Sequence, residues 1–190
     1  MPVAYRTAAL EAYLSSEGDA EVKHEFVNGE AWAMAGADIV HNLIASNLLR
    51  AIGAPLAPAR CRILGSDQRV LVAETGLYCY PDLTVQCGRP QLQGPPPVSL
   101  KNPVAVVEVL SPSTAALDRE VKFAHYRRCE SIHSILLVSQ PERRVEVYTR
   151  GEGSWTLVEG RGSGEVAVPA LGLVLELEEV YRGIEDVGAG

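Results

Sequence analysis

The stretch Pro103-Val-Ala-Val-Val-Glu-Val-Leu110 decides the fold of this 190-residue chain, because a short apolar run of this composition predicts a buried strand. Glu108 lies in the middle of that run. An ionised carboxylate in a dry interior is very costly, so it requires a partner, a metal ion or a raised pKa. A buried arginine would meet this need without any function. Side chains alternate along a strand, so Val106, Glu108 and Leu110 are predicted to share one face.

Two more charged residues lie on the predicted elements before and after this strand. Asp82 begins a second predicted strand, Tyr80–Cys87, and Lys122 belongs to a predicted helix. If the two strands are neighbours, Asp82 and Glu108 converge on a hard-oxygen site suited to Mg²⁺ or Mn²⁺. Two strand carboxylates and a lysine are the parts of a metal-dependent phosphodiesterase site. The alternatives remain open: Asp82 capping a turn, and Lys122 forming an exposed i,i+4 pair with Asp118.

The order of the predicted elements favours an α/β fold with a mixed sheet. A helix over 115–129 connects the strand 103–110 to a nearly continuous apolar strand over 132–139, which favours parallel neighbours and a right-handed crossover. Asn28-Gly29 predicts a hairpin turn. The other predicted helices are one over 7–14, one capped by Asp38 and ended by Pro55 and Pro58, and one near 176–182, and a helix start is predicted at 111–114. The other predicted strands lie near 61–64 and 68–72 and over 143–148, and two or three short strands follow Trp155. A loop is predicted over 88–102.

Composition sets the broad class. With 47% hydrophobic residues the chain is long enough for one core, so we expect a single domain over 1–190. No run approaches the ~20 apolar residues of a membrane span. The N-terminal residues lack a signal-peptide pattern, which predicts a cytoplasmic protein. The net charge of −7 argues against a broad basic surface for nucleic acid, although it leaves room for a local one.

The cysteines predict no cross-link. Cys61, Cys79, Cys87 and Cys129 are scattered, with no Cys-x-x-Cys pair and no nearby histidine. This spacing predicts buried or neutral free thiols rather than a zinc site or a disulfide framework.

Several stretches together resemble a known family. Pro81-Asp82 followed by Glu108-Val109-Leu110 resembles the Pro-Asp…(Asp/Glu)-x-Lys signature of the restriction-endonuclease-like superfamily, PD-(D/E)XK. The longer pattern is similar to the Uma family of endonucleases within it. The matching stretches cover most of the chain, in order: 23–30, Ala35-Gly36, His41-Asn42, Ser66-Asp67, 80–82, 107–114 and 118–126.

The resemblance implies a restriction-endonuclease-like mixed β-sheet flanked by helices, with additional antiparallel hairpins. It implies a metal-dependent endonuclease that uses Mg²⁺ or Mn²⁺ and acts on nucleic acid, with DNA favoured over RNA and the choice between them left open. Asp82 and Glu108 are the implied metal ligands, with Asp67 or Glu25 as a further ligand. Homodimerisation, through a sheet edge or exposed strands, is also implied by resemblance.

Three catalytic roles follow from the same resemblance. Lys122 is the implied electrostatic catalyst, so its removal is expected to abolish turnover and leave metal affinity largely intact. Glu25 and His41 complete the implied catalytic set. The alternatives are a solvated outward face for Glu25, a hydrogen-bonded histidine at the core edge for His41, and an ordinary turn residue for Asp67.

The sequence departs from the superfamily signature at one position. Leu110 stands where the lysine is expected, and in the Uma pattern the lysine migrates to the following helix, which here points to Lys122. This departure and the acidic charge keep a second hypothesis open: a catalytically inactive nuclease-fold module that binds nucleic acid or a protein partner. A third hypothesis is a purely structural partner-binding domain, which would not respond to metal.

Overall fold

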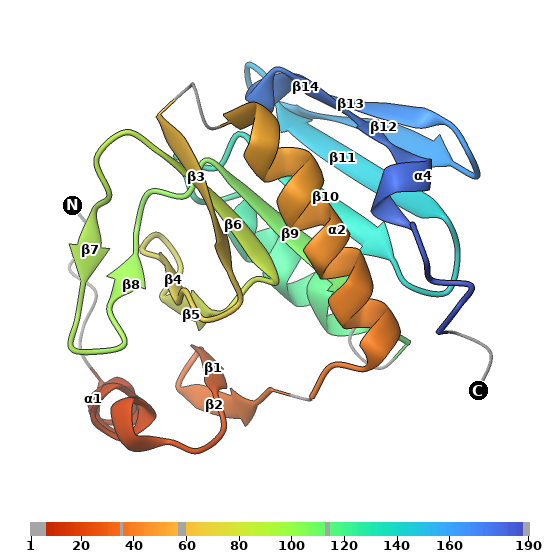
Figure 1. The fold of residues 1–190 in the computed structure, drawn as a ribbon. Coiled ribbons are helices and arrows are strands. Elements are labelled where there is room, and N and C mark those ends of the chain that lie inside the picture. Colours follow the sequence, from red (N-terminus) through yellow and green to blue (C-terminus); the bar gives the residue numbers. More distant parts are fainter. Residues whose placement is uncertain (1–6, 35, 57–59, 113–114, 188–190) are drawn as a thin grey trace.

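A six-stranded mixed sheet forms the centre of the molecule, in the order β12-β11-β10-β9-β6-β3 (Figure 1). The computed structural model describes residues 7–34, 36–56, 60–112 and 115–187. The strands are β3 Cys61–Gly65, β6 Leu83–Cys87, β9 Ala105–Leu110, β10 Ser134–Ser139, β11 Arg144–Arg150 and β12 Trp155–Arg161. β9 and β10 pair in parallel, and the other neighbours in this sheet pair antiparallel. The predicted α/β class and the parallel pair of strands are therefore confirmed.

The crossover between β9 and β10 is a helix of unusual geometry. It consists of a π-helix, η3 Leu117–Lys122, followed by one α-helical turn, α3 Phe123–Tyr126. The Phe123 N–H donates to the Asp118 carbonyl oxygen, five residues back, as a π-helix requires. The predicted helix over 115–129 is thus present in part, and Ser113 and Thr114 of its expected start lie outside the described residues.

One face of the central sheet is covered by α2 Ile39–Leu56, the short helix α4 Leu177–Val180 and the hairpin of β13 Glu165–Val168 and β14 Leu173–Glu176 (Figure 1). The side-chain oxygen Oδ1 of Asp38 accepts the His41 N–H at 2.8 Å, so the predicted helix cap is formed. Contrary to the sequence prediction, α2 continues through Pro55 to Leu56. A proline in the last turn removes only one hydrogen bond near the helix end, so the helix tolerates it there. Pro58 lies outside the described residues.

A second sheet packs toward the other face, in the order β2-β1-β5-β4-β8-β7. Its strands are β1 His24–Val27, β2 Glu30–Ala33, β4 Val70–Val72, β5 Leu77–Cys79, β7 Leu92–Gln93 and β8 Ser99–Leu100. Asn28 and Gly29 form the predicted hairpin turn, with φ of 53° and 91°. β5 was not predicted, and the expected loop over 88–102 contains β7 and β8, because two- and three-residue strands carry almost no periodic signal.

The N-terminal helix and two 3-10 turns complete the described structure. α1 Ala8–Ser16 is capped by Thr7 and packs its apolar side on the second sheet. The 3-10 turns are η1 Glu17–Asp19 and η4 Pro169–Leu171. None of the helices within the described ranges is long and apolar enough to cross a bilayer.

The prediction of four free thiols was wrong for one pair of cysteines. Cys61 and Cys87 form a disulfide between β3 and β6. They are directly opposite each other in the antiparallel register, which brings their Cα atoms to 4.0 Å, a pairing that spacing along the chain does not reveal. Cys79 and Cys129 are free and buried, as predicted.

Candidate functional site

Of the two predicted strand carboxylates, Glu108 lies in β9 and Asp82 directly precedes the neighbouring strand β6. Leu83 of β6 pairs with Val107 of β9, so one further step in this antiparallel register brings Asp82 opposite Glu108. The backbone N–H of Val109 donates to Asp82 Oδ2 at 2.7 Å and fixes the carboxylate against β9. The backbone pairing of β6 and β9 thus brings Asp82 and Glu108 opposite each other, as expected from the sequence.

Glu108 is held in the interior between β9 and the crossover helix. Its side chain is 3% exposed, and its Oε1 accepts hydrogen bonds from Tyr126 Oη at 2.5 Å and Lys122 Nζ at 3.3 Å. Burial raises the pKa of Glu108 well above its usual range; Lys122 opposes this, and the carboxylates of Asp118, Asp82 and Glu25 reinforce it. Glu108 therefore pairs with a buried lysine and not with the buried arginine of the functionless alternative.

Three carboxylates surround the Lys122 ammonium. Its Nζ lies 3.0 Å from Glu25 Oε1, 3.0 Å from Asp118 Oδ1 and 3.3 Å from Glu108 Oε1. Burial lowers the pKa of Lys122, but Glu108, Glu25 and Asp118 together outweigh burial and hold it well above its usual range. Lys122 is thus a buried, charged ammonium among acidic groups, and its pair with Asp118 is not the exposed helix pair of the alternative.

The π-helix is fixed to the central sheet at two points. Besides the Lys122 contact with Glu108, Arg119 forms a bidentate pair with Glu146 of β11, at 2.7 and 2.9 Å. Glu108 and Glu146 both lie opposite Leu137 of β10, so they share one face of the sheet, and η3 crosses that face. π-Helical turns are rare and are found frequently at functional sites, where they redirect a side chain.

His41 forms the more open side of the site. Its Nε2 lies 2.9 Å from Asp82 Oδ1, and the two side chains are 13% and 17% exposed. The hydrogen bond to Asp82 raises the pKa of His41, while burial opposes the shift. Solvent therefore reaches the site at Asp82 and His41, whereas Glu108 and Lys122 lie deeper.

Glu25 reaches the site from β1 of the second sheet. It is 6% exposed, and besides Lys122 its Oε1 accepts the Tyr80 N–H at 3.2 Å. Tyr80 in turn donates its hydroxyl to the buried Glu17, at 3.0 Å. The side chain of Glu25 is therefore directed inward, in contrast to the solvated face considered as its alternative.

Asp67 is not brought to this cluster. It lies in the turn between β3 and β4 with a side chain that is 94% exposed, and it pairs with Lys23. Among the described residues, no group of three or more His, Cys, Asp or Glu side chains is arranged to hold a metal ion. The carboxylates of Glu25, Glu108 and Asp118 instead share the Lys122 ammonium.

Sequence reasoning missed three parts of the site. The sequence predicts Asp118 only as one half of a surface ion pair, offers Tyr126 as a packing residue or a contact to a substrate phosphate without placing it in the predicted site, and gives no sign of the Val109 N–H. The spacing of Asp118, Lys122 and Tyr126, four residues apart along one side of a helix, was the available signal for the first two. A backbone N–H carries no sequence signal at all.

Comparison with protein families agrees with the geometry. Residues 10–179 match the model of Uma2, described as "Putative restriction endonuclease". The chain belongs to the Uma2 family. The uncharacterized protein sll1609 of Synechocystis sp. is 36% identical over 151 residues, covering 79% of this chain and 85% of the relative. A second uncharacterized Synechocystis protein, slr1290, is 31% identical over 175 residues, covering 92% of this chain and 91% of the relative.

A solved structure supports the same fold. A protein from Anabaena variabilis, described as a putative nuclease belonging to DUF820, superposes with a TM-score of 0.67 and covers 87% of this chain and 93% of its own. At 16% sequence identity this likeness concerns the fold alone. The predicted restriction-endonuclease-like α/β fold of this Uma2 protein is confirmed.

Proposed function

We propose that this Uma2 protein is a metal-dependent endonuclease that hydrolyses phosphodiester bonds of nucleic acid, DNA rather than RNA. The observation that supports the proposal is the backbone register that brings Asp82, directly before β6, opposite Glu108 of β9, with the buried Lys122 ammonium 3.3 Å from Glu108. A lysine beside two strand carboxylates matches the parts of the superfamily signature, with the lysine supplied by η3 instead of position 110 of β9.

The donor set fits Mg²⁺ or Mn²⁺. Carboxylate oxygens are the ligands that both ions prefer, and Mg²⁺ is commonly bound by one or two carboxylates together with waters and substrate phosphates. We therefore assign Asp82 and Glu108 as the metal ligands. We leave Asp67 outside this set because its side chain is exposed and paired with Lys23.

The protein groups have separable roles in this proposal. When bound, the metal ion would polarise the scissile phosphate and lower the pKa of a water molecule. The Val109 N–H and His41 orient Asp82, and Tyr126 orients Glu108. Lys122 supplies a fixed positive charge that stabilises the negative charge developing on the phosphate. Glu25 and Asp118 hold that ammonium in place.

Calorimetric titration of Mn²⁺ and Mg²⁺ tests the ligand assignment without a known substrate. We expect binding to wild type, loss of binding in Asp82→Asn and Glu108→Gln, and unchanged binding in Asp67→Asn, which is the matched control. Cleavage of duplex DNA by the wild type, lost in the same two variants, is the expected second result. Metal binding that survives both substitutions would contradict the assignment.

A non-hydrolytic module is the second candidate, and one observation favours it. Lys122 already neutralises the cluster of Glu25, Glu108 and Asp118, which a metal ion would otherwise do. Salt-dependent nucleic-acid binding without cleavage in Mg²⁺ or Mn²⁺ would support this candidate, whereas multiple turnovers would exclude it.

We also propose that the protein is a cytoplasmic homodimer. β12 pairs only with β11 in the central sheet, and its Leu157 and Val158 are 50% and 46% exposed. A long apolar edge strand of this kind favours pairing with another chain. Sedimentation should give a dimer at micromolar concentration, and Val158→Lys should shift it to a monomer. A monomeric wild type would contradict the prediction.

A further inference from the structure

The acidic residues of this chain are unevenly distributed. Two stretches, 39–66 and 83–107, contain no Asp or Glu at all. They carry five cationic residues, so the rest of the chain has a net charge of −12 against a total of −7. The five are Arg50, Arg60, Arg62, Arg89 and Lys101. A protein that is acidic overall therefore has a segment of strong positive charge.

The fold brings four of these five cations together. Arg62 of the edge strand β3 donates to the Gln86 side chain at 2.9 Å and to the Gly88 carbonyl at 3.3 Å. The Gly88 N–H donates to the Arg60 carbonyl at 3.2 Å, and the Arg89 carbonyl accepts from Asn102 at 3.0 Å. Asn102 follows Lys101 directly. We call the surface formed by Arg60, Arg62, Arg89 and Lys101 the basic edge.

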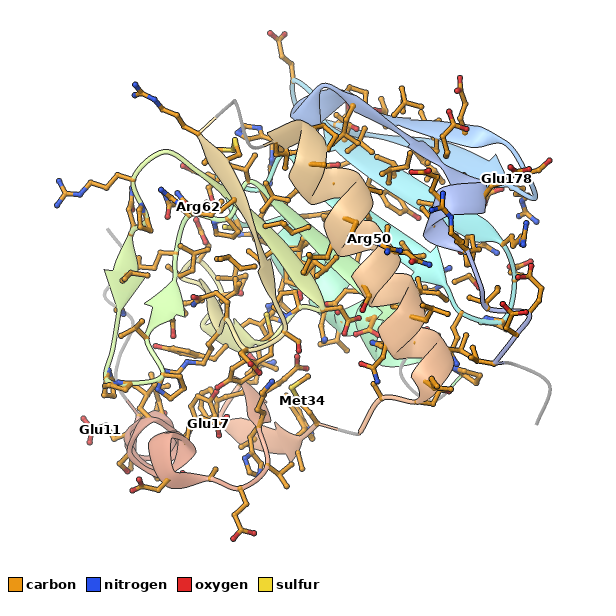
Figure 2. The ribbon with its side chains drawn as sticks, viewed as in Figure 1. Glu11, Glu17, Met34, Arg50, Arg62 and Glu178 are labelled. Atoms are coloured by element: carbon orange, nitrogen blue, oxygen red, sulfur yellow. A yellow bond between two sulfur atoms is a disulfide. The ribbon has the colours of Figure 1, made fainter. Side chains whose placement is uncertain are left out.

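The basic edge has no acidic partner within the part of the chain that the structure describes. None of its four cations takes part in a salt bridge with a described residue, and its three arginines are exposed. By contrast, the half-buried Arg143 and the exposed Arg161 and Arg182 each pair with a glutamate. Figure 2 shows Arg62 on the opposite side of the view from Glu178 of the acidic helix α4. Unpaired arginines on an otherwise acidic protein are available to an anionic partner.

The position of the basic edge relative to the site is fixed by β6. Asp82 precedes this strand, and Cys87, at its other end, is followed by Gly88 and Arg89. Five residues of extended strand span about 17 Å, which corresponds to about five base pairs of a duplex at 3.4 Å each. A duplex of about five base pairs is therefore long enough to reach from the basic edge to Asp82.

We propose that the basic edge is the surface that binds the phosphates of duplex DNA and positions it for the site at Asp82 and Glu108. This assignment rests on the proposed endonuclease function and adds to it the route by which an acidic protein retains its substrate. Phosphate contacts give affinity and register without reading sequence. The basic edge therefore predicts binding that depends strongly on salt and little on base sequence.

The experiment compares two triple variants of the full chain. Arg60→Gln with Arg62→Gln and Arg89→Gln removes three charges of the basic edge. Arg143→Gln with Arg161→Gln and Arg182→Gln removes three charges from glutamate-paired arginines and is the matched control. Fluorescence anisotropy with a 20-base-pair duplex, in Ca²⁺ and at several NaCl concentrations, gives the slope of log affinity against log salt.

We expect the basic-edge variant to reduce the magnitude of this slope by about 2.7, which is three phosphate contacts at about 0.9 each. Its affinity at fixed low salt should fall at least about tenfold, while the control variant stays within about twofold of wild type. Unchanged Mn²⁺ binding shows that the basic-edge variant is folded.

Equal losses in the two variants, or no loss in the basic-edge variant, would overturn the surface assignment. The proposed function fails by a different result, namely absence of metal-dependent cleavage by the wild type. A wild type that cleaves DNA while the basic-edge variant binds it normally would leave the function standing and remove only the surface. A wild type that binds no duplex at low salt would overturn the surface as well.

Discussion

Lys122 concentrates the electrostatics of the site in one side chain. Its side chain is 7% exposed, and its ammonium contacts three buried carboxylates. Removing one partner of a buried ion pair leaves uncompensated charge, which costs far more than the intact pair contributes. The same ammonium also repels any divalent cation that approaches Glu108. This arrangement revises the expectation that loss of Lys122 leaves metal affinity intact.

The prediction for Lys122→Met is a less stable protein with a higher affinity for Mn²⁺ and no turnover. The free energy of unfolding should fall by about 3–5 kcal/mol in metal-free buffer, and added Mn²⁺ should restore part of it because the metal neutralises the freed carboxylates. Urea titrations with and without Mn²⁺ measure both effects. Lys101→Met, which removes an ammonium that has no ion pair with a described residue, should change neither quantity appreciably. Destabilisation that Mn²⁺ leaves unaltered would contradict the argument.

For single residues, the sequence identified which side chains carry charge at the candidate site but not which residues they contact. Glu108 was recognisable because an acidic residue interrupts an apolar run, and Lys122 because the family pattern places a lysine on the next helix. Asp118 had the same spacing to Lys122 that a surface pair would have, and only the packing of η3 on the sheet shows that it is buried. Asp67 illustrates the opposite case, since a polar turn residue has the same local sequence whether or not its side chain lies near a site.

Helix α2 shows how an element positions the site. Asp38 accepts the His41 N–H at the start of this helix, and three residues into it the His41 side chain reaches Asp82. Gln140 donates to the other oxygen of Asp38, at 2.7 Å. The His41 N–H and Gln140 together hold the pKa of Asp38 below its usual value. The cap thus stabilises the part of α2 that carries a site residue.

Asp38→Ala should lower the free energy of unfolding by about 1 kcal/mol, the usual cost of losing an N-cap. Asp38→Asn keeps the cap and should lose much less. A carboxyl with a lowered folded pKa contributes stability above its unfolded pKa and loses it as pH falls through the folded value. The difference in free energy of unfolding between wild type and Asp38→Ala is therefore expected to be larger at pH 6 than at pH 3, as measured by urea titration. A difference that grows toward low pH would contradict the sign of this linkage.

The hairpin of β13 and β14 and the helix α4 both make close contacts with the central sheet at Gly160 of β12. A Cβ atom at this position would lie 2.9 Å from Leu177 Cδ1 and 3.0 Å from Val166 Cβ. Gly160→Ala is therefore expected to lower the free energy of unfolding by about 1–3 kcal/mol through overpacking. Gly65→Ala is the control, because nothing lies within 4 Å of its added Cβ. Thermal melts of the two variants make the comparison, and equal melting temperatures would show that the hairpin shifts freely.

Elements with a long apolar pattern or a clear turn signal were predictable from the sequence, and very short strands were not. The apolar stripe of α2, the Asn28-Gly29 turn and the apolar runs of β9 and β10 each carry several residues of consistent signal. β5, β7 and β8 have two or three residues, and the pairing that defines them is supplied by the rest of the second sheet. The helix η3 contacts Glu108 and Glu146 of the central sheet, and the sequence of the helix alone does not reveal these contacts.

Over the whole molecule, the disulfide and the basic edge lie in the same place. Cys61 is flanked by Arg60 and Arg62, and Cys87 is followed by Gly88 and Arg89. The disulfide joins the outermost strand β3 to β6, the strand that Asp82 precedes. A covalent link at this edge therefore holds the proposed DNA-binding surface in fixed relation to the site. The cytoplasm keeps most thiols reduced, so the redox state of this pair bears on both stability and the proposed location.

We expect reduction of Cys61–Cys87 to lower the free energy of unfolding by about 3–4 kcal/mol, from the chain entropy of closing a loop across 26 residues. Urea titrations with and without reductant measure the difference, and the double variant Cys61→Ser with Cys87→Ser should not respond to reductant.

Burial raises the pKa of the Cys79 and Cys129 thiols, so both should resist alkylation in the folded protein and react only after unfolding. Alkylation of the unfolded, non-reduced protein should therefore label two cysteines. Four labelled cysteines would show that Cys61 and Cys87 are reduced in the isolated protein. The hydrogen bonds between β3 and β6 would then hold β3 in place without a disulfide.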